Sequence, residues 1–177
     1  MATKQNTNLI LALDPSMTGF GWVVLNKEGK IYNQGCIKTE PSHKKLGIRK
    51  GDDRVRRIME INTELISIIK KYGIKLIVSE QPHGSQSAVA AVMIGIVAGI
   101  VQTLADSFKI AVEYYFGGDC KHNLLGVRSA GKGATIEAIG KKYDITFTGT
   151  KYKDEAVADA MAVFDIAAAQ SSIIRIL

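Results

Sequence analysis

The sequence contains little cysteine and no segment typical of export. Only 2 of its 177 residues are cysteine. Cys36 and Cys120 are far apart and form no Cys-x-x-Cys pair, which excludes a zinc ribbon and a disulfide framework. The polar segment from Met1 to Asn8 lacks the apolar core of a signal peptide. Two isolated thiols are typical of a reducing compartment, so we expect a cytoplasmic protein.

Long apolar runs are also scarce. The one strongly apolar stretch, Ala88 to Leu104, contains Gly95, Gly99 and Gln102 and falls short of a membrane span. We therefore expect a buried helix there and no membrane partner. Its small residues permit close helix packing, so the same helix is also a candidate dimer interface.

No repeat, low-complexity tract or long linker divides the chain. Because 46% of the residues are hydrophobic, the chain can form a substantial core. We expect a flexible N-terminus at 1–7, one domain at 8–170 and a C-terminal tail at 171–177. The formal net charge of +6 favours an anionic partner, most often nucleic acid.

Hydrophobic periodicity predicts three hairpin strands followed by alternating helices and strands. This order predicts an α/β fold with a five-stranded mixed sheet, antiparallel in its first three strands and flanked by helices on both faces. The predicted strands are 8–14, 20–26, 31–37, 74–80 and 110–116. The predicted helices run from a cap at Asp52 or Asp53 to Gly73, then over 86–107, 117–126, 131–143 and 153–169.

Acidic residues stand at corresponding places in these elements. Asp14 ends the first strand and Glu80 ends the fourth, and ligand sites of α/β sheets lie beyond such strand ends. Asp159 interrupts an otherwise apolar helix, and Glu155 shares its helix face, whereas Asp154 points elsewhere. Convergent carboxylates need a hard cation such as Mg²⁺ between them. The simpler interpretation is that Asp14 only forms a turn and that Asp159 lies at the surface.

Ordered motifs along the chain resemble those of the RuvC family of Holliday-junction resolvases, within the RNase H-like superfamily. The resemblance covers Leu9 to about Ala168. It rests on Asp14-Pro-Ser-x-Thr-Gly-x-Gly, Ile77-Val78-Ser79-Glu80-Gln81, Lys121 with Leu125-Gly126, Gly131-Lys132-Gly133-Ala134 and Asp159-Ala160-Met161-Ala162.

The resemblance implies an RNase H-like fold and a homodimeric, magnesium-dependent crossover junction endodeoxyribonuclease of a bacterium or a phage-infected cell. It would cut branched DNA, chiefly four-way junctions. Two Mg²⁺ ions per active site, or Mn²⁺ in their place, would be held by Asp14, Glu80 and Asp159, with Glu155 as a further candidate. Lys121 would act at the scissile phosphate. Further DNA contacts are expected from His83, Arg128 and Lys132.

One position departs from the family pattern. Relatives usually have another acid three residues before the last one, where this chain has Ala156. Three interpretations stay open: Glu155 or, with poorer geometry, Asp154 takes its place, the chain uses three acids, or alanine has replaced a native acid.

A basic cluster follows the first hairpin. It is a candidate DNA-binding patch, although Asp52 and Asp53 lie among its bases and a solvated face is the alternative. Its members are Lys44, Lys45, Arg49, Lys50, Arg54, Arg56 and Arg57.

Three other functions compete with that of a junction resolvase. The first is a relaxed flap or fork endonuclease, and the second is a catalytically silent junction-binding protein, which Ala156 favours. The third is an RNase H-fold ATPase of the sugar-kinase type, for which the chain is too short to provide a second lobe.

Overall fold

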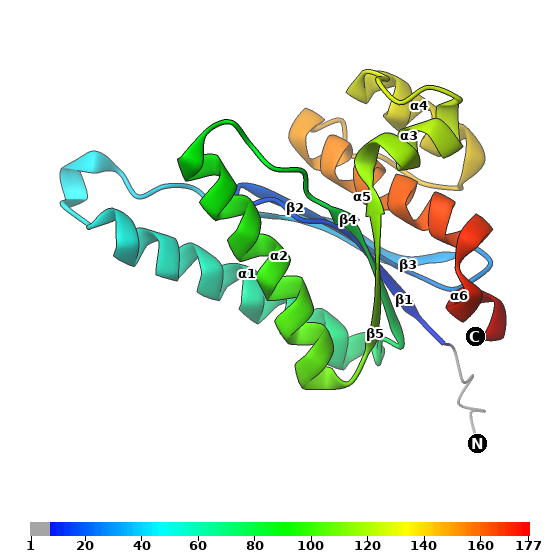
Figure 1. Ribbon diagram of the computed structural model, residues 1–177, viewed down its shortest axis with the longest axis horizontal. Coiled ribbons are helices and arrows are strands. Elements are labelled where there is room, and N and C mark those ends of the chain that lie inside the picture. Colours follow the sequence, from blue (N-terminus) through cyan, green and yellow to red (C-terminus); the bar gives the residue numbers. More distant parts are fainter. Residues whose placement is uncertain (1–7) are drawn as a thin grey trace.

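The computed structural model describes residues 8–177, which form a mixed five-stranded sheet between two helical layers (Figure 1). The spatial order is β3-β2-β1-β4-β5. The first three strands pair antiparallel, whereas β4 runs parallel to β1 and β5. The expected sheet is therefore confirmed. The strands are β1 (Ile10–Asp14), β2 (Gly19–Leu25), β3 (Ile31–Lys38), β4 (Leu76–Gln81) and β5 (Ala111–Phe116).

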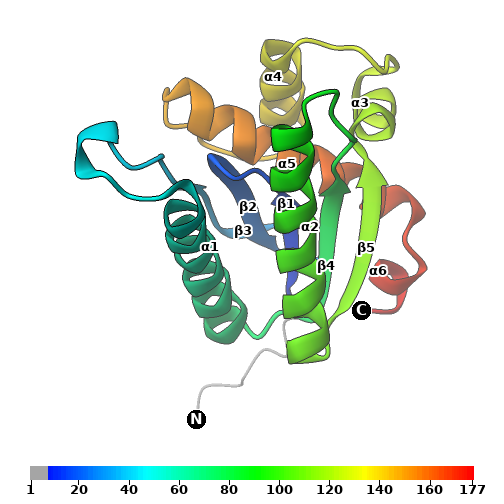
Figure 2. The same ribbon diagram turned by 60° about the vertical axis from the view of Figure 1, so that its left-hand side comes forward.

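Helices cover both faces of the sheet, as Figures 1 and 2 show. The first two α-helices pack on one face and the others on the opposite face. The helices are η1 (Lys44–Leu46), α1 (Lys50–Tyr72), α2 (Ala88–Phe108), α3 (Gly117–Leu125), α4 (Lys132–Lys142), α5 (Lys151–Gln170) and α6 (Ser172–Ile176).

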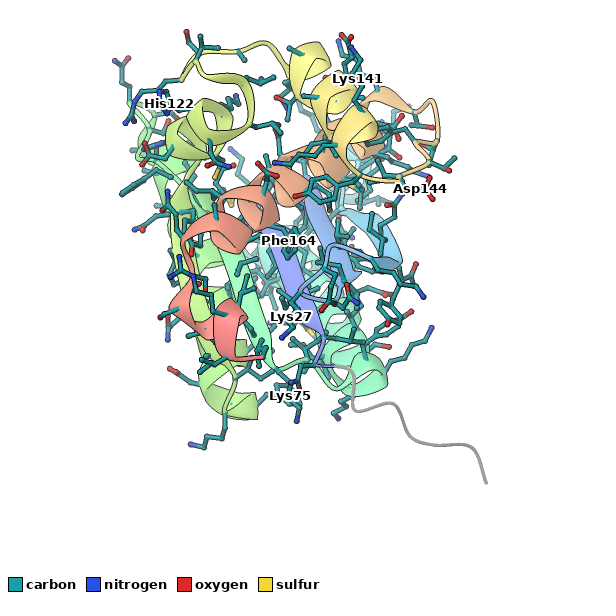
Figure 3. All side chains as sticks on the ribbon, turned by 90° about the vertical axis from the view of Figure 1, so that its right-hand side faces the viewer. Lys27, Lys75, His122, Lys141, Asp144 and Phe164 are labelled. Carbon is teal, nitrogen blue, oxygen red and sulfur yellow. The ribbon has the colours of Figure 1, made fainter. Side chains whose placement is uncertain are left out.

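Alternation along the strands creates two cores. Leu11 and Leu13 of β1 pack towards α1 and α2, whereas Ile10 and Ala12 face α5. Phe164 of α5 is 1% exposed in this second core and is labelled in Figure 3. Because the sheet is buried on both faces, its central strands are continuously apolar.

A glycine brings α5 very close to the sheet. Gly21 of β2 pairs with Asp14, and a Cβ atom at Gly21 would lie 2.1 Å from the backbone oxygen of Ala156. Only glycine permits this approach. The first half of α5 is consequently placed against the strand end that carries Asp14.

Two local predictions differ from the structure. The first helix begins at Lys50 without a side-chain cap. Asp53 does not cap it, because its carboxylate accepts hydrogen bonds from the backbone N–H and hydroxyl of Ser42 instead. The segment 171–177, expected as a tail, contains α6, where Ile174 is 4% exposed and packs in the second core.

The prediction of a buried helix at α2 is also only half right. Val97, Val101 and Leu104 lie in the first core, but Val89 and Val92 are 66% and 49% exposed. By length and apolar composition α2 could cross a membrane, contrary to the expectation that its glycines and Gln102 make it too short. In the structure it is a surface helix with one apolar face uncovered.

Candidate active site

Parallel pairing of β1 and β4 places two acids side by side. Leu13 is in register with Ser79, so Asp14 and Glu80, the next residues, end neighbouring strands. Asp14 alternates onto the same face as Ile10 and Ala12, which contact α5. Both carboxyl groups therefore point towards the layer formed by α3, α4 and α5.

The opposing layer supplies two further acids. Asp159 and Glu155 lie one turn apart on α5, and both are partly buried. The ammonium of Lys132, in the first turn of α4, donates a hydrogen bond to Glu155 at 3.1 Å and lies 3.9 Å from Asp159 Oδ2. The prediction that Glu155 and Asp159 share one face is confirmed.

The acids raise one another's pKa. Burial, followed by the charges of Glu80 and Asp159, raises the pKa of Asp14 well above its usual value. Burial and the charge of Asp159 raise that of Glu80. Burial and the charge of Glu155 likewise raise the pKa of Asp159, which Lys132 and Lys121 oppose. The site thus holds more negative charge than its own bases neutralise.

These groups surround a cleft of about 430 Å³ at the ends of β1 and β4. Lys121 of α3 also lines it. Gly117 leaves room for Glu80, because a Cβ atom there would lie 2.6 Å from Glu80 Oε1. The lining residues are Asp14, Ser16, Gly19, Glu80, Gly117, Lys121, Lys132, Tyr152, Glu155, Ala156 and Asp159.

The cleft offers the donor atoms of a divalent-cation site, but these donors are not grouped closely enough to bind an ion. Its donors are carboxylate oxygens, the ligands that Mg²⁺ prefers, and the lining contains four acids but only two lysines. Within residues 8–177, no three His, Cys, Asp or Glu side chains are grouped closely enough to hold a metal ion. The residues therefore fit Mg²⁺ in kind, and binding would require the acids to move closer together.

The cleft also identifies residues that the sequence analysis missed. Ser16 in the β1–β2 turn and Tyr152 on α5 line it. The ammonium of Lys38 lies 5.0 Å from the centre of the Tyr152 ring. The Pro-Ser-x-Thr-Gly turn could have indicated Ser16, whereas Tyr152 depends on how α5 packs.

The two neighbours of Glu155, Asp154 and Ala156, differ in their position relative to the cleft. Asp154 points away, as predicted, and accepts hydrogen bonds from Thr148 and from the backbone N–H of Gly149. It cannot act as the missing acid. Ala156 lines the cleft and is 5% exposed, so the departure from the family pattern lies inside the site.

The basic cluster is split between different roles. Arg57 is 7% exposed and donates hydrogen bonds to Thr39 Oγ1 and the Met17 backbone oxygen. Its assignment to a DNA-binding patch is therefore wrong, because it joins the β3–α1 loop to the turn after Asp14. Arg56 is held by Asp53 and Glu60.

The remaining bases of the cluster do not line the cleft. Arg49 pairs with Asp52 at 2.7 Å. Outside the cluster, Arg128 pairs with Asp119 at 2.6 Å and lies at a separate pocket beside β5. The other bases, which the structure places in η1 and at the start of α1, are Lys44, Lys45, Lys50 and Arg54.

His83 follows β4 and is exposed. Its ring stacks on Phe116, with centroids 5.3 Å apart and an angle of 16° between the planes. One ring face is therefore already covered. Phe116, at the end of β5 and 47% exposed, forms an aromatic pair with His83 that the sequence did not predict.

Comparison with known proteins points to one family. No family model matches the chain. It is 30% identical over 161 residues to a crossover junction endodeoxyribonuclease RuvC from Endomicrobium trichonymphae, covering 88% of this chain and 77% of that protein. It is 26% identical over 157 residues to the RuvC of Rickettsia massiliae, covering 87% and 94%.

The fold is similar to that of a solved resolvase. The T. thermophilus RuvC structure in complex with a Holliday junction substrate superposes with a TM-score of 0.72 at 18% identity, covering 90% of this chain and 92% of that one. The RNase H-like architecture expected from the sequence is thereby confirmed.

Proposed function

This chain belongs to the RuvC family, and on that premise we propose that it is an endonuclease that resolves four-way DNA junctions by paired, metal-dependent hydrolysis of phosphodiester bonds. The observation that carries the proposal is the convergence of Asp14, Glu80 and Asp159 on one cleft beside Lys121. The similarity to a protein of Endomicrobium trichonymphae that is named a crossover junction endodeoxyribonuclease supports the junction-cutting part of the proposal.

Divalent cations are proposed as cofactors. Asp14, Glu80 and Asp159 would hold two Mg²⁺ ions, or Mn²⁺, because their carboxylates are the partly buried oxygen donors of the cleft. When bound, such ions supply Lewis acidity and orient a water molecule for attack on phosphorus. Glu155 is the weaker ligand candidate, since Lys132 already binds it.

The chain's own residues provide the remaining chemistry. The ammonium of Lys121 faces the three acids, lowering the pKa of each, and would stabilise negative charge on the scissile phosphate. Lys132 would pair with the adjacent phosphate once DNA displaces it from Glu155.

A homodimer is proposed because a symmetric junction needs two opposed active sites. The uncovered face of α2 is the candidate interface. Gly95 and Gly99 are one turn apart and have open space above them, since a Cβ atom added at either would meet nothing within 4 Å. Sedimentation of the wild type and of Gly95→Arg tests this, with a dimer expected only for the wild type.

A reducing compartment keeps isolated cysteines in the thiol form. Cys36 and Cys120 are both free thiols in the structure, and the cytoplasm is the proposed location. This rests on the cysteines alone.

The test of the proposed function uses labelled four-way, flap and linear DNA of equal length, each with Mg²⁺ and with EDTA. Paired symmetric nicks in the four-way junction, dependent on Mg²⁺, are expected. Equal cutting of the flap would favour a relaxed branched-DNA nuclease. Equal cutting of the linear duplex, or no binding to any branched DNA, would refute the proposal.

Ala156 favours a second candidate function, a catalytically silent junction-binding protein. Asp14, Glu80 and Asp159 match the family's acids, but the position of the family's usual further acid is Ala156, which has only a methyl group, although the neighbouring Glu155 also lines the cleft. Tight binding of the four-way junction without any nick in Mg²⁺ or Mn²⁺ would support this alternative.

A further inference from the structure

The loop between β3 and α1 projects from the body of the molecule, as Figures 1 and 2 show. We call residues 43–50 the basic tip. Its short helix η1 has no buried residue. Leu46 is 67% exposed and Ile48 is 46% exposed. Two large aliphatic side chains are therefore exposed to solvent at the end of a projecting loop.

The shape of the basic tip is maintained by local contacts. The His43 ring accepts a hydrogen bond from the backbone N–H of Lys45 at 3.2 Å, and Gly47 adopts a φ of 62° that closes the turn. Below the tip, Asp53 binds both Ser42 and Arg56. The exposed Leu46 and Ile48 are thus carried on an anchored turn.

The charge around these two side chains has one sign. Lys44, Lys45, Arg49 and Lys50 all lie within the basic tip and are exposed. Among the described residues, Arg49 is the only one of these four that forms an ion pair, with Asp52. A partner must therefore present both anionic groups and an apolar surface within the span of one turn.

The basic tip belongs to the same end of the sheet as the acidic cleft. β3 runs antiparallel to β2, and Lys38 at its end pairs with Gly19, while Gly19 also lines the cleft. Arg57 ties Thr39, at the base of the loop, to Met17 in the turn after Asp14. DNA held in the cleft would extend past this loop.

We propose that the basic tip inserts Leu46 and Ile48 between two base pairs in an arm of branched DNA, opening that step, while its lysines hold the flanking phosphates. DNA offers phosphates and apolar base faces a few ångströms apart, and aliphatic wedges between basic residues open base steps in this way. The inference rests on the proposed function and adds to it a site away from the cleft.

An anionic membrane surface shares part of this chemistry. Two side chains on one turn offer far less apolar area than the amphipathic helix that membrane association usually needs. The basic tip also lies at the same end of the sheet as the acidic cleft, which favours DNA. Membrane binding is therefore an outcome of the test rather than part of the proposal.

The experiment measures binding and base unstacking with 2-aminopurine placed in turn at each step of one arm of a four-way junction, in EDTA. For Leu46→Ser/Ile48→Ser we expect about a tenfold weaker junction affinity and loss of the fluorescence increase at one step. Leu46→Met/Ile48→Met should retain both. Ile176→Ser, which alters an 83% exposed aliphatic residue at the C-terminus, is the matched control.

A second variant separates charge from insertion. Lys44→Gln/Lys45→Gln should weaken binding to junction and linear duplex alike and lower the slope of log affinity against log salt by about two. The serine variant should leave that slope unchanged. Circular dichroism and melting temperatures verify that each variant is folded.

Failure of this inference is distinguishable from failure of the proposed function. If the wild type binds and nicks the junction and the serine variant matches it in affinity and fluorescence, the wedge is refuted and the function stands. If the wild type binds no junction, both fail. Loop-dependent binding to vesicles of phosphatidylserine and phosphatidylcholine, without a fluorescence change in DNA, would also overturn the wedge.

Discussion

Lys132 on α4 binds Glu155 on α5 across the edge of the acidic cleft, with 3.1 Å between Nζ and Oε2. Burial lowers the pKa of Lys132, but its hydrogen bond to Glu155 and the charges of Asp159, Glu155 and Asp14 together raise it. Glu155 is therefore partly neutralised by a base. The acids with the greatest need for a cation are Asp14, Glu80 and Asp159.

This arrangement predicts the effect of restoring an acid at position 156. Ala156→Asp adds a fifth acid to the cleft wall, beside Asp14, Glu80, Glu155 and Asp159, at a position that is 5% exposed, so repulsion should lower the unfolding free energy in EDTA by about 1–3 kcal/mol. Mg²⁺ should raise the melting temperature more in the variant than in the wild type, because binding stabilises the folded state. Thermal unfolding against Mg²⁺ concentration measures both effects.

Ala168→Asp is the control for that variant, since it places an acid on the exposed part of the same helix. It should show no added response to Mg²⁺. An equal Mg²⁺ response in wild type and Ala156→Asp would contradict a metal site next to position 156.

Gly117→Ala should impair the cleft without unfolding the protein. The new methyl group would lie 2.6 Å from Glu80 Oε1, so the carboxylate must move. We expect junction cleavage to fall by about 10- to 100-fold, the range found when metal-binding groups lose their support. Single-turnover nicking rates measure this.

Gly51→Ala is the matched control, because nothing lies within 4 Å of its Cβ position. It should cut at the wild-type rate. Wild-type cleavage and Mg²⁺ dependence in Gly117→Ala would show that the nicking rate does not depend on the position of the Glu80 carboxylate.

Arg57→Met tests whether this arginine is structural. Its loss removes a donor from the Met17 backbone oxygen and from Thr39 Oγ1. We expect a loss of about 1–3 kcal/mol in unfolding free energy, whereas the salt dependence of DNA affinity should stay unchanged. Lys45→Met should show the opposite pattern, with unaltered stability and a reduced salt dependence. A lower slope of log DNA affinity against log salt for Arg57→Met would show instead that Arg57 contacts DNA.

Asp53 predicts a dependence of stability on pH. Hydrogen bonds from Ser42 and Arg56 lower its pKa to about 2, below the value of about 3.9 expected when unfolded. Its stabilising effect is therefore fully present above about pH 4 and is lost as the pH falls towards 2. Melting temperatures of wild type and Asp53→Asn should differ at pH 6 and converge at low pH. A constant difference at every pH would contradict this.

Much of the site could be predicted from local sequence. Asp14 and Glu80 end apolar runs, and strand alternation together with parallel pairing is sufficient to place them on one face. Asp159 and Glu155 share a helix face by their four-residue spacing. The helix of Asp159 faces the sheet because it is otherwise apolar.

The errors concern residues whose environment depends on distant segments. Arg57 resembled its basic neighbours, and only the approach of Thr39 and Met17 shows that it is buried. The contact between Lys132 and Glu155 depends on how α4 packs on α5. The exposed face of α2 could not be distinguished from its buried one, because both are apolar.

The central claim is that Asp14, Glu80 and Asp159 hold the metal ions that cut DNA, and single-turnover nicking of a labelled four-way junction by Asp14→Asn tests it most directly. The control is Asp144→Asn, which alters an exposed acid outside the cleft that Figure 3 labels. We predict normal junction binding, more than about 100-fold slower nicking in Asp14→Asn and wild-type nicking in Asp144→Asn. Wild-type nicking by Asp14→Asn in Mg²⁺ would contradict the account.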